Sequence, residues 1–172
     1  MIFFRILGGI LVCAACGLLG LYMSHKGVAR AKQLAEFRQS LLMLKSEIEF
    51  AAYPLPQAFA HIAQRTEGSL TAFYELLSHK LTGKEAGLAD AWETGLTELS
   101  SSHLASEDLQ AIGSLGNALG SIDSAAQIKA IDMTLTAIDV ILARLAAQNT
   151  KDGKMYRRLG LLGGVLIVVV LL

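Results

Sequence analysis

Apolar residues recur every three or four positions in two long stretches of the chain, with polar residues between them. The apolar positions of the first stretch are Leu34, Phe37, Leu41, Leu44 and Ile48. This spacing predicts an amphipathic helix with one apolar side. We expect the helix to end near Tyr53, because Pro54 and Pro56 lack backbone donors and hold the residues before them in an extended conformation.

The second long stretch begins after Ser124-Ala125-Ala126-Gln127, a sequence that predicts a helix-starting capping box. Its apolar positions are Ile128, Ile131, Leu135, Ile138, Leu142 and Leu145. The spacing predicts a second long helix, which can continue to the end of the chain. We expect the two long helices to pack as an antiparallel pair.

Four shorter helices are predicted between the two long ones. They cover residues 56–65, 69–81, 89–99 and 106–120. Ser69 and Ser106 are expected to be N-caps, and Gly120 is expected to end its helix in a left-handed conformation. No alternating pattern indicates a strand. The predicted fold class is therefore all-α, a cytoplasmic bundle of about six helices between two terminal transmembrane helices.

The composition is too apolar for an ordinary soluble domain. The chain has 172 residues, of which 53% are hydrophobic, and its mean hydropathy is +0.47. From Ile2 to Met23 the chain is apolar apart from Arg5. At about 1.5 Å per residue this stretch can cross a hydrocarbon core of about 30 Å. A cleaved signal peptide is the alternative, but no cleavage site precedes a polar start. Residues 1–23 are thus predicted to be a transmembrane helix.

Residues 159–172 are wholly apolar and are also predicted to enter the membrane. They make only about 21 Å of helix, so crossing needs local thinning of the bilayer or snorkelling by Arg157 and Arg158. A buried tail of a soluble domain is the alternative. The predicted organisation is a transmembrane helix at 1–23, a cytoplasmic helical domain at 24–158 and a C-terminal transmembrane helix at 159–172.

Basic residues flank the central domain at both ends. They are Lys26, Arg30 and Lys32 after the first span and Lys151, Lys154, Arg157 and Arg158 before the second. The positive-inside tendency therefore places the central domain in the cytoplasm. Residues 33–150 contain fourteen acidic and seven basic side chains, a net charge of −7. This acidic domain disfavours nucleic acid as a partner and favours a basic protein surface.

No pattern in the sequence predicts an enzyme. Cys13 and Cys16 lie inside the first span, where a thiol is unreactive. The four histidines are His25, His61, His79 and His103, and no two of them have the spacing of a metal site. Glu47 and Glu49 do not share a helix face, which disfavours a pair for acid–base catalysis. We expect no catalytic residue, no cofactor, no metal and no small-molecule substrate.

Several residues are candidates for packing or for protein contact. Gly113, Gly116 and Gly120 fall in one predicted helix and weaken it by about 1 kcal/mol each relative to alanine, so something must offset that loss. Close packing within the domain is one explanation, and approach by another subunit is the other. Pro54-Leu55-Pro56 is likewise either a packing elbow or an exposed recognition loop. Trp92 is expected to be buried.

A set of short sequences resembles the stage III sporulation protein AB family in order and spacing. They are Glu47-Ile48, Pro54-Leu55-Pro56-Gln57-Ala58, Ile62-Ala63, Ala91-Trp92, Leu115-Gly116, Leu119-Gly120 and Asp123. The two apolar ends match as well. The family is similar to the cytoplasmic domain of the inner-membrane platform protein of type II secretion and type IV pilus machines. The candidate interaction or packing residues are Glu47, Pro54, Leu55, Pro56, Trp92, Gly116, Gly120 and Asp123.

The resemblance implies a subunit of the sporulation channel complex, in the mother-cell membrane around the forespore. Its implied partners are other channel proteins, including a secretion-type ATPase, and a homo-oligomer is possible. We therefore predict a non-enzymatic membrane platform or adaptor. A membrane-anchored regulator without a channel role is the main alternative. A small membrane enzyme or transporter is disfavoured because neither span contains an acidic residue or a histidine pair.

Overall fold

The protein folds entirely into helices over the residues that the structure, a computed structural model, describes. These are residues 27–51, 53–83, 87–100, 102–120 and 123–171, with side chains described as far as residue 148. They form six α-helices, one π-helical turn and no strand, which confirms the predicted all-α class. Residues 30–143 form one compact unit, to which the following description applies.

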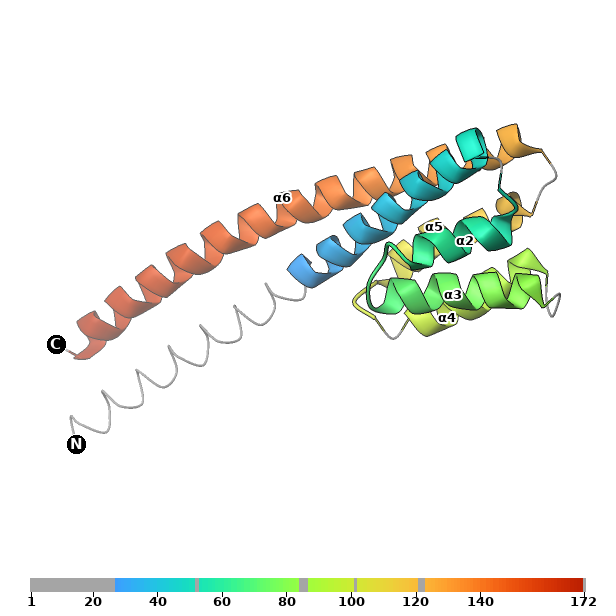
Figure 1. Cartoon of the computed structure of the whole chain (residues 1–172). Helices are drawn as coiled ribbons and strands as arrows, with labels where there is room; N and C mark the ends of the chain where they lie inside the picture. Colours follow the sequence, from blue (N-terminus) through green and yellow to red (C-terminus); the bar gives the residue numbers. More distant parts are fainter. Residues whose placement is uncertain (1–26, 52, 84–86, 101, 121–122, 172) are drawn as a thin grey trace. The chain divides into compact units, whose positions relative to one another are not determined.

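The observed helices agree with the predicted ones to within a few residues (Figure 1). An α-helix over residues 27–46 continues into the π-helical turn η1 (Glu47–Ala51). The other helices are α2 (Leu55–Ala63), α3 (Ser69–Thr82), α4 (Leu88–Leu99), α5 (Ser106–Leu119) and α6 (Ser124–Leu171). Each of α2 to α4 contacts the next helix in the chain, as short connections between helices favour.

The two long helices run antiparallel, as predicted. The Arg38 Nε and an Asp139 oxygen are 2.6 Å apart, and the Lys45 Nζ and an Asp132 oxygen are 2.7 Å apart. Between these two ion pairs the first helix advances by seven residues while α6 goes back by seven. Because seven residues make about two helical turns, the same faces meet at both levels. The ion pairs therefore mark the register of the pair.

Aromatic rings from four helices meet in the core. Phe37 of the first helix contacts Phe73 and Tyr74 of α3, with ring centroids 6.0 and 6.5 Å apart. Phe59 of α2 lies 5.9 Å from Tyr74, and Trp92 of α4 lies 5.1 Å from Phe73. Perpendicular and offset rings at these distances attract one another beyond the effect of burial. The cluster joins α2, α3 and α4 to the first long helix.

Two predicted helix starts are wrong by one residue. Ser69 and Ser106 are the first helical residues of α3 and α5 and not their N-caps. The Ser69 hydroxyl accepts a hydrogen bond of 2.9 Å from the Gln33 amide instead of capping its own helix. At α5, the backbone N–H of Ala105 donates to Asp108 over 2.8 Å. An acidic side chain in the first turn thus reaches back to the N–H of the N-cap residue, which is one of the two bonds of a capping box.

The turn between α5 and α6 also differs from the prediction. Gly120 has φ −71°, so it is right-handed and not the expected left-handed cap. Asp123 accepts a hydrogen bond of 3.0 Å from the N–H of Ala125, which makes Asp123 the N-cap of α6 in place of Ser124. The Gln127 amide donates to the Leu119 carbonyl over 2.8 Å and occupies an acceptor that the end of α5 leaves open.

Both predicted membrane spans fall beyond the described side chains. Residues 1–23 lie outside the described residues, and residues 159–172 belong to the part of the chain whose side chains are not described. Among the residues described, no helix combines the length and apolar character needed to cross a bilayer. The spans therefore stay predictions from the sequence.

Candidate interaction surface

The residues singled out from the sequence lie in three places in the fold. They are, in chain order, Glu47, Pro54, Leu55, Pro56, Trp92, Gly116, Gly120 and Asp123. The first four lie at the junction of η1 and α2, and the next two meet in the core. The last two flank the turn before α6, where the Asp123 cap gives the pair a structural role.

Gly116 and Trp92 form the tightest contact between α4 and α5. The Trp92 side chain is 1% exposed, which confirms its predicted burial. A Cβ atom at Gly116 would lie 2.5 Å from the indole Cγ, far inside van der Waals contact. The indole N–H also donates to the Ile112 carbonyl over 3.3 Å. Gly116 therefore packs against its own chain, which is the first of the two explanations predicted for it.

The chain turns sharply between η1 and α2. The Pro54 carbonyl accepts hydrogen bonds from the N–H groups of Gln57 and Ala58, at 2.9 and 3.1 Å, so it begins α2. Pro56 lies in the first turn of α2, where its missing N–H costs nothing. The Ser78 hydroxyl of α3 donates to the Pro56 carbonyl over 2.8 Å. These bonds fix the turn as a rigid elbow.

Glu47 and the elbow are joined through His61 of α2. The Glu47 Oε2 atom lies 3.6 Å from His61 Nδ1, and the Tyr53 ring is perpendicular to the imidazole at 5.1 Å. His61 of α2 thus contacts one residue of η1 and one residue of the turn itself. The contact holds η1 and α2 together and leaves the Glu47 carboxylate partly accessible.

An exposed aromatic surface surrounds this turn. Phe50 is 79% exposed and Tyr53 is 45% exposed, beside the exposed residues Glu49 and Pro54. We call these four residues the aromatic corner. Burying a phenylalanine side chain is worth about 1.5–3 kcal/mol, so an exposed one on a rigid turn is suited to contact another protein. A π-helical turn next to it is also a feature that is frequent at functional sites.

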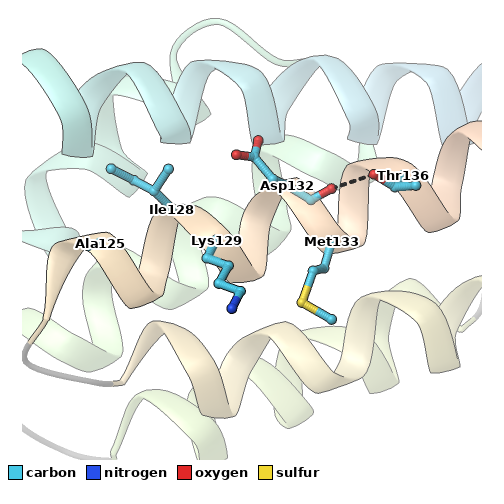
Figure 2. Close-up of a pocket in the computed structure, with 6 residues that line it drawn as sticks. All are labelled: Ala125, Ile128, Lys129, Asp132, Met133 and Thr136. Atoms are coloured by element: carbon cyan, nitrogen blue, oxygen red, sulfur yellow. Dashed lines mark hydrogen bonds between the residues drawn. The ribbon is translucent and has the colours of Figure 1, made fainter.

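A shallow groove of about 420 Å³ runs along the start of α6. Its lining residues are Ala125, Ile128, Lys129, Asp132, Met133 and Thr136. We call it the α6 groove. In Figure 2, Lys129 and Met133 point to one side of the helix and Asp132 points to the other. Asp132 is held by Lys45, whose pKa is raised by this hydrogen bond, whereas Lys129 makes no ion pair with any residue described.

A buried ion pair was not foreseen from the sequence. The Asp108 side chain is fully buried and accepts two hydrogen bonds of 2.7 Å from Arg30, at the base of the first helix. These bonds raise the pKa of Arg30. The two residues are 78 positions apart in the chain, so no local spacing indicates the pair. The Arg30 guanidinium binds the Asp108 carboxylate through two hydrogen bonds, a geometry that holds the first helix to α5.

The described part of the chain contains no cluster of three metal-binding side chains. The aromatic corner and the α6 groove are considered as sites for protein contact because of their exposed apolar side chains. Phe50 was missed because it lies outside the apolar spacing that ends at Ile48. An apolar residue out of phase with its helix is the signal that could have identified it.

Comparison with known proteins agrees with the resemblance found in the sequence. The family model of stage III sporulation protein AB matches residues 5–172. The stage III sporulation protein AB of Bacillus subtilis (strain 168) is 25% identical over 169 residues, covering 98% of this chain and 99% of that protein. A solved structure of stage III sporulation protein AB has a TM-score of 0.66 at 24% identity, covering 71% of this chain and 97% of its own. The chain belongs to the stage III sporulation protein AB family.

Proposed function

We propose that this protein is a non-enzymatic membrane platform or adaptor subunit of the sporulation channel complex. It would link a cytoplasmic secretion-type ATPase to membrane components during spore formation. The observation that carries the proposal is the family match, which extends from residue 5 to residue 172 and so includes both apolar ends. The exposed aromatic corner supports it, since an adaptor acts through its surfaces.

Anchoring at both ends follows from the sequence. The apolar segments at 1–23 and 159–172 enter the mother-cell membrane, and the basic residues beside them keep the central domain in the cytoplasm. Within the unit 30–143, the antiparallel pair of long helices has its first and last residues at the same end, as two anchors in one membrane require. The rigid elbow at Pro54 places the aromatic corner where the first long helix ends.

The aromatic corner is the surface that we assign to assembly. Phe50 and Tyr53 offer apolar area, and Glu49 beside them offers a charge to a basic partner. Aromatic residues at the centre of an interface carry much of its binding energy. Trp92 and Gly116 act differently, because their contact with each other is buried and sets only the shape of the bundle.

The proposal is tested by copurification. A tagged full-length chain is solubilised from membranes of sporulating cells, and the bound proteins are identified by mass spectrometry. We expect a secretion-type ATPase and other channel proteins. The variant Phe50→Asp should reach the membrane at the normal level but retain fewer partners, while the matched control Val140→Asp, on an exposed site of α6, should retain them.

Two results would count against the adaptor role. Recovery of the chain in the soluble fraction would contradict its proposed role as a membrane platform. Recovery from the membrane with a single cytoplasmic regulator and no channel protein would instead support the alternative of a membrane-anchored regulator.

A further inference from the structure

We propose that the aromatic corner of one copy of this chain binds the α6 groove of a second copy. The inference rests on the proposed function in one respect, namely that the aromatic corner is an assembly surface. The inference adds that a second copy of this chain binds at that surface. The resulting unit is a dimer in which each copy contributes both a corner and a groove.

The two surfaces match in apolar character. The α6 groove is shallow and open and is lined by residues of α6 alone, so the ring of Phe50 can lie against it. Ile128 and Met133 provide its apolar lining, and the Met133 side chain is 67% exposed when nothing covers it. Methionine makes favourable contacts with aromatic rings and adapts its shape to them.

The two surfaces also match in charge. Lys129 lies in the groove without an ion pair to any described residue, whereas Asp132 nearby is already bound to Lys45. Glu49 lies next to Phe50, is exposed, and forms no salt bridge within the described part of the chain, although its charge also raises the pKa of Lys45. A second copy that inserts Phe50 would bring Glu49 close to Lys129. Both members of the complementary pair therefore belong to this chain, which favours a second copy over an unrelated partner.

The register of the long helices favours a closed dimer. Lys45 lies opposite Asp132, so Phe50, five residues further on, is about level with Gln127, five residues back. The corner and the groove are consequently at the same end of the helix pair. Two copies related by a two-fold axis can therefore each place their aromatic corner on the α6 groove of the other copy. Both copies are then fully paired, and no further copy can be added through these surfaces.

The test is charge reversal in the full-length chain, purified in detergent and studied by analytical ultracentrifugation. We expect the parent to dimerise, and Glu49→Lys and Lys129→Glu each to weaken the dimer about tenfold or more, because each places like charges together. The double variant Glu49→Lys with Lys129→Glu should dimerise again, since every contact then joins opposite charges. Glu75→Lys, an exposed site on α3, is the matched control and should have no effect.

A cross-link supplies a measurement that does not depend on charge. In a chain with Cys13→Ala and Cys16→Ala, the double variant Phe50→Cys with Met133→Cys should form a disulfide between copies on mild oxidation. Mixing two chains that each carry one of these cysteines should give the same product. Circular dichroism confirms that each variant is folded.

Three results would overturn the inference. They are a parent that stays monomeric, a dimer that tolerates both single charge reversals, and a double variant that fails to restore association. These assays contain only this chain, so they are independent of channel partners. Loss of the dimer with normal copurification of channel proteins would contradict this inference but not the proposed function. A normal dimer without channel partners would contradict the proposed function but not this inference.

Discussion

Gly116 of α5 lies directly against the indole of Trp92 in α4, so close that a single added methyl group would overlap the indole at 2.5 Å. The close approach explains why a helix interior contains a residue that weakens helices. It also decides which of two explanations holds for Gly116. The neighbouring group belongs to the same chain, so the glycine serves the fold.

Two glycines of α5 should respond in opposite ways to the same substitution. Gly116→Ala should lower stability by about 1–3 kcal/mol, because the indole must move. Gly113→Ala should raise it by up to about 1 kcal/mol through helix propensity. A Cβ at Gly113 meets only Leu96, at 3.6 Å. Thermal unfolding of the full chain in detergent, followed by circular dichroism, measures both changes. Equal shifts would contradict this account of α5.

Removing the indole should be more costly. Trp92→Ala deletes a buried ring that contacts Phe59 and Phe73 and loses the hydrogen bond to Ile112. We expect a loss of about 3–5 kcal/mol, the usual cost of such a cavity. The same thermal unfolding measures it. A loss below about 1 kcal/mol, typical of surface positions, would show that the core tolerates the cavity.

The Arg30–Asp108 ion pair should matter more than the ion pairs of the long helices. Arg30→Ala leaves a buried carboxylate whose remaining hydrogen bond, among the residues described, comes from the N–H of Ala105, and we expect a loss of about 3 kcal/mol. Such a loss corresponds to a fall in Tm of about 6–12 °C for a chain of this size. Arg38→Ala is the control, because Asp139 is half exposed and water can replace the partner. The control should change the Tm little.

The sequence predicts this fold well wherever a local pattern decides the structure. The apolar spacing at Leu34 and Phe37 and the break at Pro54 are local, and the helices they predict are present. Caps were less predictable, because the buried Asp108 carboxylate accepts a hydrogen bond from the N–H of Ala105, which is the N-cap of α5 in place of Ser106.

Contacts between distant residues could not be predicted in the same way. Nothing near Asp108 indicates that Arg30 lies beside it, and nothing near Gly116 names Trp92 as its neighbour. The α6 groove exists because the neighbouring helices leave the side chains of Lys129 and Met133 exposed. The apolar spacing of α6 does not indicate which of its side chains stay exposed. Candidate surfaces for binding are therefore found from the packed bundle rather than from the periodicity.

The predicted topology can be tested with one exposed site. Glu93 is exposed on α4, and Glu93→Cys in a chain with Cys13→Ala and Cys16→Ala gives a single thiol. If the central domain is cytoplasmic, an impermeant maleimide should label this thiol only after the cytoplasmic side has been opened. Labelling of intact cells from outside would instead place the central domain on the outer side of the membrane and contradict the prediction.

Tyr74 should make the fold sensitive to alkaline pH. Its hydroxyl is buried and lies 2.6 Å from Ser40 Oγ, and since Ser40 donates its own proton to the Phe37 carbonyl, Tyr74 is the donor. Burial raises the pKa of Tyr74 well above its usual value. A phenol with a raised pKa in the folded state contributes stability that is complete below the unfolded pKa of about 10 and is lost as the pH rises further.

Tyr74→Phe should therefore change both the level and the slope of stability against pH. At pH 8 the variant should be less stable by about 1 kcal/mol, the net worth of one hydrogen bond, because Ser40 keeps its bond to Phe37. Above about pH 10, where a free tyrosine titrates, the parent should lose stability more steeply than the variant. Urea unfolding of the two chains across this range measures the difference. Parallel curves would mean that the Tyr74 hydroxyl reaches water in the folded state.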